Sequence, residues 1–418
     1  MVTCRFLQKK PFAIILLVIT CFSPGFSQEK ERIRVQDENG TIILEGEIEI
    51  YGDKIDTVWV RRFNSNGIKI EEKRFKNGDL HGAWKRWYGN GSKKFIIKYK
   101  KGVVHGTSEN YDSTGLTIIQ GRYKNGELHG KQKEWFSNGK LLKVAVYRLG
   151  LMNGDYNEWW EDGEEKIKGQ YSANIKEGQW TYYDPGRRSR YEFHRSGELF
   201  SSYDFEYYEN GQLKEEPSFD AGTIDGRWIE YFQGGEKSSQ REYKKGKPDG
   251  NWIAWNEETN KKIQEMEYKD SLLVNEYNEW WKSGEEKIEG QYTSNKKDGQ
   301  WTYYDPGRRS RYEFYRSGEL FSFYDFEYYE NGQLKEEPSF DAGTIDGRWI
   351  EYFQDGEKAT QREHKRGKPD GNWITWDEET NRKIQEMEYK DSLLVDEYNE
   401  WWKSGEEKIE GQYTSNKK

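Results

Sequence analysis

Three histidines recur at the same place in consecutive repeats and are the first candidates for chemistry. His81, His105 and His129 are 24 residues apart, so a row of imidazoles could hold metal ions. Each histidine stands directly before a glycine, and no carboxylate or second histidine lies beside it at a ligand-like spacing. We therefore expect these histidines to be structural, and we predict no metal ion and no cofactor.

Paired carboxylates are the second candidates, because glycosidases use two acids across a cleft. Glu164 and Glu165 form such a pair, and Glu285 and Glu286 form another. Both pairs lie beside a predicted turn, and a flat sheet offers no enclosed pocket that would shift their pKa values. We expect solvated turn charges. The sequence also contains no phosphate-binding loop, nucleophile elbow or Cys-His pair, so we predict that the protein is not an enzyme.

Aromatic rings are the third candidates. The chain holds 18 Trp, 30 Tyr and 19 Phe, although only 33% of its residues are apolar and 34% are charged. So few apolar residues cannot fill a conventional interior, yet so many rings exclude a disordered chain. The core must be thin, aromatic and spread along the chain.

A 24-residue period supplies the elements that position these rings. It is marked by glycines at 82, 106, 130, 154 and 178, and continues at Ser202, Gly226, Gly250, Asn275, Gly299, Phe323, Gly347, Gly371 and Asp396. Upstream, the rhythm extends to Val58 and to a first unit near Glu31. About fifteen such units fill the chain, and a missed repeat would have led to the wrong fold.

Each unit reads as a β-hairpin. In the unit that begins at Gly82, a strand precedes Gly89-Asn90-Gly91, and a second strand precedes a looser turn at Lys101-Gly102. We expect the Asn-Gly pair to supply the positive φ angles of the hairpin turn. In the second strand, Phe95, Ile97 and Tyr99 alternate with Ile96 and Lys98, as a half-buried antiparallel strand requires. The predicted fold is all-β: an elongated single-layer antiparallel sheet of tandem hairpins.

The first strand of a unit carries Trp at position three and Tyr or Trp at position six, which places the two rings on opposite faces unless a bulge intervenes. We expect position three to be core and position six to be free for binding. The candidate binding rings are Trp87, Trp160, Tyr183, Tyr231, Trp255, Trp281, Tyr304, Tyr352, Trp376 and Trp402. An exposed ladder of rings could pack against a protein or stack on sugars.

The pattern Gly-x-Trp-x-x-Tyr, Asn-Gly, aromatic, Lys-x-Gly-x-x-x-Gly resembles the MORN-repeat variant. This hairpin repeat occurs in YwqK-type antitoxin-like proteins and in many secreted bacterial proteins. The resemblance covers nearly everything from residue 31 to the end. It implies a repeat scaffold, and it implies an antitoxin- or immunity-like role.

A longer period of 121 residues lies on top of the first. Residues 178–275 match residues 299–396 with eleven differences in 98 aligned pairs. His194 corresponds to Tyr315, and His364 to Tyr243, so we expect a ring rather than an imidazole to be required at both places. The predicted divisions are a signal peptide (1–27), an irregular first repeat (28–57), degenerate repeats (58–154), two copies of a five-unit block (155–275 and 276–396) and a partial third copy (397–418).

The first 27 residues are typical of a secretory leader. Arg5, Lys9 and Lys10 precede an apolar run over 12–19, and Gly25-Phe26-Ser27 offers small residues for cleavage. Cleavage before Cys21 would instead give a lipoprotein, but Thr20 stands where a smaller residue is usual. We expect a secreted, periplasmic or cell-surface protein with no transmembrane helix after cleavage.

The charge of the chain without its leader narrows the classes of partner that it can bind. Removing the leader takes the formal charge from −9 to −12, which argues against nucleic acid as a partner. Both cysteines, Cys4 and Cys21, lie in the leader. The sequence therefore predicts a non-enzymatic extracytoplasmic scaffold that binds a protein, with glycan or cell-wall binding through the aromatic ladder as the alternative.

Overall fold

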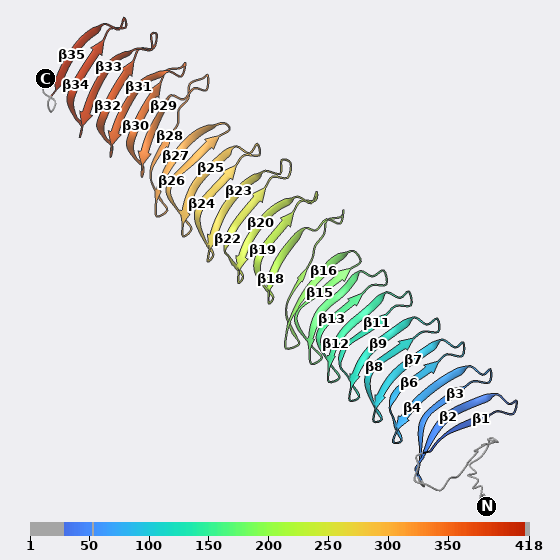
Figure 1. The fold of residues 1–418 in the computed structure, drawn as a ribbon. Helices are drawn as coiled ribbons and strands as arrows, with labels where there is room; N and C mark the ends of the chain where they lie inside the picture. Colours follow the sequence, from blue (N-terminus) through green and yellow to red (C-terminus); the bar gives the residue numbers. More distant parts are fainter. Residues whose placement is uncertain (1–28, 52–53, 414–418) are drawn as a thin grey trace, which may run out of the picture. The chain divides into compact units, whose positions relative to one another are not determined.

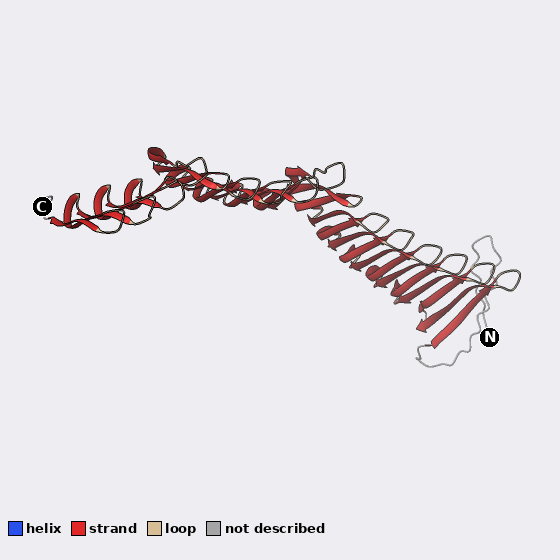
Figure 2. Cartoon of the chain, turned by 90° about the horizontal axis from the view of Figure 1, so that it is seen from above, coloured by secondary structure: helices blue, strands red, loops and turns tan. Residues whose placement is uncertain are grey.

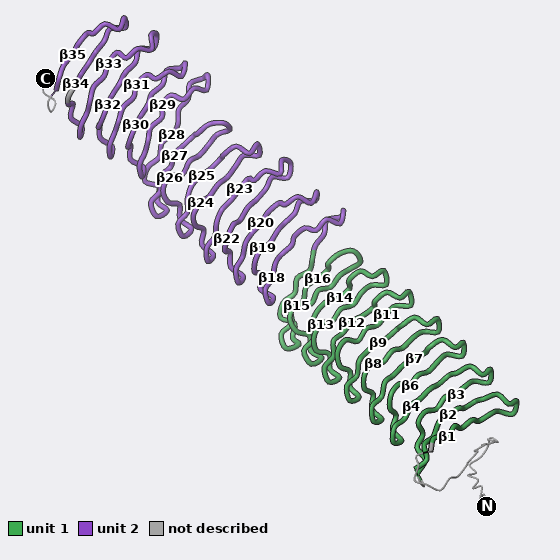
Figure 3. Tube along the Cα trace, viewed as in Figure 1, with its two compact units in different colours: residues 1–205 green, residues 206–418 purple. Residues whose placement is uncertain are grey.

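The computed structural model describes residues 29–51 and 54–413, so the predicted leader lies outside the described residues. Within these ranges the chain forms 35 strands joined by turns, and contains no helix (Figures 1 and 2). No helix in this part of the chain could therefore span a membrane. The chain divides into two compact units, residues 1–205 and 206–418 (Figure 3). The all-β prediction is confirmed.

The strands form three antiparallel sheets of 17, 11 and 7 strands. The first sheet, in the first unit, consists of β1 (Glu29–Gln36), β2 (Ile42–Tyr51), β3 (Lys54–Phe63), β4 (Lys69–Lys76), β5 (Asp79–Leu80), β6 (Gly82–Trp87), β7 (Lys93–Lys100), β8 (Val103–Tyr111), β9 (Thr117–Lys124), β10 (Glu127–Leu128), β11 (Gly130–Trp135), β12 (Leu141–Arg148), β13 (Leu151–Trp159), β14 (Glu165–Ser172), β15 (Ile175–Asp184), β16 (Arg187–Arg195) and β17 (Glu198–Asp204).

The other two sheets belong to the second unit. One consists of β18 (Glu215–Asp220), β19 (Thr223–Tyr231), β20 (Lys237–Lys244), β21 (Lys247–Pro248), β22 (Gly250–Trp255), β23 (Lys262–Lys269), β24 (Leu272–Trp280), β25 (Glu286–Thr293), β26 (Lys296–Asp305), β27 (Arg308–Arg316) and β28 (Glu319–Asp325). The other consists of β29 (Glu336–Asp341), β30 (Thr344–Tyr352), β31 (Lys358–Lys365), β32 (Lys368–Trp376), β33 (Lys383–Lys390), β34 (Leu393–Trp401) and β35 (Glu407–Tyr413).

Strand register separates the two rings of each repeat. In the hairpin β6–β7, Gly82 faces Tyr99 and Trp84 faces Ile97, and pairing stays in step until a register shift at Trp87. The residue without an opposite partner is on the second strand, so the first strand keeps its alternation. We call the face with positions one, three and five, such as Trp84, the odd face. The face with positions two, four and six, such as Trp87, is the even face.

The turn that contains Asn-Gly differs from the prediction. Gly91 has a φ of 86°, but Asn90 does not have a positive φ. The loop has three residues, Gly89 to Gly91, and closes with Tyr88 N–H donating to the carbonyl of Ser92. In this three-residue loop only the last residue needs the left-handed conformation. Asn90 acts through its side chain instead, because its Oδ1 accepts a hydrogen bond from Ser92 N at 3.0 Å.

The opposite edge of the sheet holds the tight turns, where a looser turn was predicted. Lys101 and Gly102 both have positive φ, 52° and 76°, as the two-residue type I′ turn requires. Asn77-Gly78 and Asn125-Gly126 adopt the same conformation. The two turn types are therefore reversed relative to the sequence-based interpretation, because the number of loop residues depends on which residues pair.

The prediction of one uninterrupted sheet is also corrected, since within the described residues of the second unit no backbone pair joins β28 to β29. Pro338 lies in the middle of β29 and has no N–H to donate, which confines such a strand to a sheet edge. Side chains bridge the break instead. The ring centroid of Phe340 in β29 lies 5.0 Å from that of Phe314 and 5.7 Å from that of Tyr324.

The thin core consists mainly of rings. Trp180 and Trp301, the same position in the two block copies, are each only 1% exposed although they lie in a single-layer sheet. Trp180 packs on Tyr156 and Tyr171, with ring centroids 5.5 and 4.9 Å away, and Lys176 Nζ lies 4.7 Å from its ring centre. Rings and lysine stems thus supply the second layer that a lone sheet lacks.

Candidate functional site

The position-three rings form a stack along the odd face. The ring centroid of Trp252 lies 5.6 Å from that of Tyr243, and in the second block copy Trp373 lies 5.6 Å from His364. His364 therefore takes the place of Tyr243 as a ring, as the duplication predicted. Burial also lowers the pKa of His364, which favours the neutral form at pH 7. The expectation that position three is core agrees with this packing.

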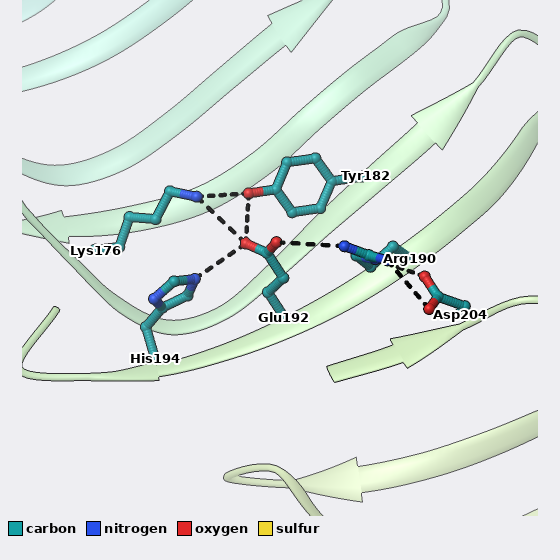
Figure 4. Close-up of polar contacts among 6 residues, drawn as sticks. All are labelled: Lys176, Tyr182, Arg190, Glu192, His194 and Asp204. Atoms are coloured by element: carbon teal, nitrogen blue, oxygen red, sulfur yellow. Dashed lines mark hydrogen bonds and ion pairs between the residues drawn. The ribbon is translucent and has the colours of Figure 1, made fainter. Parts of the chain in front are cut away.

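A polar cluster covers the odd face near the end of the first unit, and Glu192 is at its centre (Figure 4). Tyr182 Oη donates to Glu192 Oε2 at 2.7 Å, and His194 Nε2 lies 3.0 Å from the same oxygen. Lys176 Nζ lies 3.3 Å from Glu192 and donates to Tyr182 Oη at 2.6 Å. The carboxylate thus receives three donors from two strands, β15 and β16.

Arg190 and Asp204 close the outer side of this cluster. Arg190 Nε and Nη2 donate to the two carboxylate oxygens of Asp204 at 2.5 and 3.1 Å, and Arg190 Nη1 lies 4.0 Å from Glu192. Such a bidentate pair fixes the guanidinium in orientation. The chain of contacts joins β15, β16 and β17 through side chains as well as backbone.

The electrostatics of the cluster favour a structural role. Burial alone would raise the pKa of Glu192, but the hydrogen bonds from Tyr182 and His194 and the charge of Lys176 outweigh it and hold the pKa at about 2. Burial and the bond to Glu192 raise the pKa of Tyr182 above its ordinary value. Both groups therefore keep one protonation state near neutral pH, where a general acid or base must exchange its proton.

The same arrangement recurs in the second unit, where Glu313 is the central carboxylate. Tyr315 Oη donates to Glu313 at 2.8 Å in the place of His194. Lys297 donates to Tyr303 at 2.6 Å, and Arg311 pairs with Asp325. Because the phenol of Tyr315 and the imidazole of His194 make the same contact with the central carboxylate, the prediction of a ring at this position agrees with the geometry.

Seven of the ten candidate binding rings lie at position six on the even face, and all seven are half-buried: Trp87, Tyr183, Tyr231, Trp255, Tyr304, Tyr352 and Trp376. Charged side chains of the preceding hairpin accompany them. Lys69 Nζ lies 4.2 Å from the ring centre of Trp87, and Tyr231 Oη donates to Glu216 at 3.3 Å. Burial, together with a hydrogen bond to Glu165, raises the pKa of Tyr183 to about 12.

The other three candidates, Trp160, Trp281 and Trp402, occupy position seven, the residue directly before the three-residue loop, whose N–H closes the loop. At this position in another repeat, Tyr88 Oη donates to the backbone carbonyl of Tyr111 in the next hairpin at 2.9 Å. This tyrosine thus joins neighbouring turns, whereas the indole N–H groups of Trp160 and Trp281 are buried without a hydrogen-bond partner among the described residues. Trp402 is the exposed member of the ten, with 54% of its surface accessible. The ten candidates therefore lie in two rows rather than one.

Eight further rings lie at position six but were not among the candidates: Phe63, Tyr111, Trp135, Trp159, Tyr207, Trp280, Tyr328 and Trp401. Strict counting from the position-one residue would have found them. At Trp159-Trp160, Trp280-Trp281 and Trp401-Trp402 the second tryptophan of the pair was chosen, whereas the first continues the ladder on the even face.

The histidines precede position one and so lie at the other end of the strand from the position-six ring, whereas the paired carboxylates reach the ladder, since Glu165 is hydrogen-bonded to Tyr183 and Glu286 to Tyr304. His81, His105 and His129 are one hairpin apart, and His105 Nδ1 accepts a hydrogen bond from Asn125 N at 3.4 Å. In residues 29–51 and 54–413, no three His, Cys, Asp or Glu side chains are grouped closely enough to hold a metal. Glu164 accepts a hydrogen bond from Gly186 N at 2.6 Å and so links two turns.

The MORN repeat variant family model matches the sequence in four places, residues 80–101, 128–148, 205–220 and 326–341. No curated protein matches the chain. Among solved structures, the chain is similar to those described as "Crystal Structure of TcdB2-TccC3-Cdc42", with 11% identity over 92% of this chain, and "Crystal Structure of TcdB2-TccC3-TEV", with 11% identity over 89%. The chain spans 28% and 24% of those chains, and both TM-scores are 0.14, which is too low to assign a common fold.

Proposed function

We propose that the chain is a non-enzymatic, extracytoplasmic repeat scaffold that binds another protein through the even face of its sheets. The observation that carries this proposal is the row of position-six rings. They recur once per hairpin on one face, at a spacing of about 9.5 Å, or two inter-strand distances. A repeated row of half-buried rings among charged groups has the composition of a protein interface, where aromatic anchors lie within a polar rim.

The surroundings of the rings favour a protein over a glycan. A sugar stacks on an open ring face, whereas Lys69 lies over the ring of Trp87, and Lys237 lies 5.9 Å from the ring centre of Trp255. Cations in these places compete with a sugar for the same ring faces. Lysine and glutamate beside a ring can instead pair with charges on a protein partner.

The titratable groups support a role without catalysis. Every described Asp or Glu with a resolved shift, including Glu72, Glu109 and Glu313, has its pKa lowered. General acids need the opposite shift, towards neutral pH. These carboxylates are instead committed to ion pairs and hydrogen bonds within the sheet.

Export and an antitoxin- or immunity-like role complete the proposal. The basic, apolar and small residues of 1–27 support export. The four matches to the MORN repeat variant support a repeat scaffold, and an immunity-like role would have it neutralise a partner protein by covering it. Mass spectrometry of the mature chain tests export, since cleavage after Ser27 leaves Gln28 as the first residue.

The binding experiment uses the two copies of the duplicated block, because equivalent rings can be substituted in one copy or in both. The mature chain, immobilised, is offered the envelope fraction of its source cells before and after protease digestion, with and without soluble cell-wall glycan. We expect a protease-sensitive partner that the glycan does not displace. The variants Trp255→Ala and Trp376→Ala, at equivalent positions of the two copies, should each weaken capture, and the double variant should weaken it further by lost avidity.

The matched control is Tyr88→Phe, which removes one hydrogen bond at the turn edge and leaves the even face intact. It should capture as much partner as the unmodified chain. All variants must show the same far-ultraviolet circular dichroism as the unmodified chain. Capture that survives protease but is lost with glycan would establish the glycan alternative and overturn the protein-binding proposal.

A further inference from the structure

The even face of the first unit carries a basic hollow of about 740 Å³. Arg122, Lys131 and Lys133 line it, together with His105 and His129. In the strand register, Arg122 of β9 lies opposite Thr107 of β8, and Lys133 of β11 lies opposite Gln120 of β9. The cations therefore come from neighbouring strands of two hairpins. Among the described residues, none of the three cations forms an ion pair. Unpaired charges gathered in this way attract a negatively charged partner.

Glu109 lies on the same face of the sheet, opposite Gln120 in the pair β8–β9. Glu109 accepts hydrogen bonds from Tyr111 Oη at 2.5 Å and from Gln120 Nε2 at 3.1 Å. None of the described residues that line the hollow is acidic, so its lining is positively charged in a chain whose formal net charge is −9.

The even face of the second unit carries the opposite charge. A hollow of about 390 Å³ is lined by Glu276 and Glu289 with the amides of Asn278 and Gln300. Glu267 lies on the neighbouring strand on the same face. Glu289 accepts from Tyr304 Oη at 3.2 Å, and Glu267 accepts from Asn275 Nδ2 at 2.8 Å.

None of Glu267, Glu276 and Glu289 forms an ion pair with a described residue. Their hydrogen bonds come from neutral donors, so the negative charge of this hollow is not neutralised. The acidic hollow therefore complements the unpaired cations of the basic hollow.

Side chains in the two hollows have the same spacing, because both hollows are formed by the same hairpin repeat. Neighbouring strands are about 4.8 Å apart, and alternate residues along a strand are about 6.8 Å apart, so carboxylates and cations recur at matching distances. We propose that the basic hollow of one copy binds the acidic hollow of a second copy, which gives a charge-driven, head-to-tail self-association. This goes beyond the proposed function and does not depend on the identity of its protein partner.

The duplication identifies which acidic hollow takes part. The equivalent hollow of the first block copy, about 470 Å³ in volume, has Lys168 where the second copy has Glu289. Its charges are mixed, since Asp155 and Glu177 also line it. The hollow around Glu289 is therefore the one whose charge complements the basic hollow. Because each copy supplies one hollow of each kind, the contact is heterologous.

Sedimentation velocity of the mature chain tests the proposal directly. We expect self-association at about 0.02 M salt and its loss at about 0.5 M, where the Debye length is only a few ångströms. The basic-hollow variant Arg122→Glu/Lys131→Glu/Lys133→Glu should be monomeric, and so should the acidic-hollow variant Glu267→Lys/Glu276→Lys/Glu289→Lys. The former retains acidic hollows and the latter basic ones, so a mixture of the two should form a 1:1 complex.

The control reverses as many charges away from the hollows, in Lys54→Glu/Lys76→Glu/Lys100→Glu, where each lysine is exposed at the turn edge. It should associate like the unmodified chain. An unmodified chain that stays monomeric at low salt would overturn the proposal. Binding of the polyanion heparin by the basic hollow would not change that conclusion. A mixture of the two hollow variants that forms no complex, although both are folded by circular dichroism, would overturn it as well.

Discussion

Trp180 lies flat against the backbone of Gly169 on the neighbouring strand. A Cβ placed on Gly169 would be 2.3 Å from Cδ2 of the indole, and the same distance separates Gly290 from Trp301 in the second block copy. These two position-three tryptophans are buried in a single-layer sheet because the residue beneath each of them has no side chain. The glycine is needed for space, since its φ is not in the left-handed region.

We expect Gly169→Ala to destabilise the first unit by about 1–3 kcal/mol, the usual cost of overpacking a filled site. The indole would have to leave its place between Tyr156 and Tyr171. Urea unfolding followed by tryptophan fluorescence measures the effect. Gly89→Ala is the matched control, because Gly89 has open space around its Cβ position and no positive φ, and it should change stability little. Equal effects of the two substitutions would contradict the packing argument.

Leu149 is an unfavourable residue for its turn. It has a φ of 52° in the type I′ turn with Gly150 and is 61% exposed, whereas Asn77 and Asn125 occupy the same place in other repeats. Asparagine tolerates the left-handed conformation better than leucine does. Leu149→Asn should therefore raise the free energy of unfolding by about 0.5–1 kcal/mol. Leu151→Asn, an exposed strand position nearby, should not stabilise, and the thermal midpoints of the two variants provide the comparison.

The carboxylate of Glu192 should make the first unit sensitive to acid. Its folded pKa of about 2 lies below the ordinary value of 4.5, so the unfolded chain takes up the proton first as the pH falls. The stabilisation is present above pH 4.5 and is lost as the pH falls towards 2. Glu192→Gln should be less stable than the unmodified chain at pH 6, and the difference should shrink by pH 3. A difference that does not vary with pH would show that the charge of Glu192 contributes nothing.

Deleting one block copy should leave a folded chain. Asn275 faces Tyr292 in the pair β24–β25, and Asp396 faces Tyr413 in β34–β35, so removing residues 276–396 brings Asn275 opposite Tyr413 in an unchanged register. The deletion also removes the break between β28 and β29. Because each hairpin contacts mainly its neighbours, the mean residue ellipticity should be unchanged. Deleting residues 276–384 instead joins position one of a hairpin to a second strand, and that product should lose ordered structure.

The sequence by itself determined the features that depend on one strand at a time. Alternation along the chain placed Trp84 and Trp87 on opposite faces, and the duplication identified His364 as a replacement for the ring of Tyr243. These inferences hold because side-chain direction in a strand is a local property with a period of two. The prediction that hairpins repeat every 24 residues likewise needed only local sequence patterns.

The tertiary structure decided whatever depends on a second strand. The turn types at Asn90-Gly91 and Lys101-Gly102 follow from which residues pair across the loop. The break before β29 follows from the absence of a donor at Pro338. The burial of Trp180 depends on Gly169, a residue of the preceding strand, and the contrast between the basic and acidic hollows depends on which charges remain unpaired after folding. A repeat pattern does not fix these features, because each is a distance between atoms of different strands or hairpins.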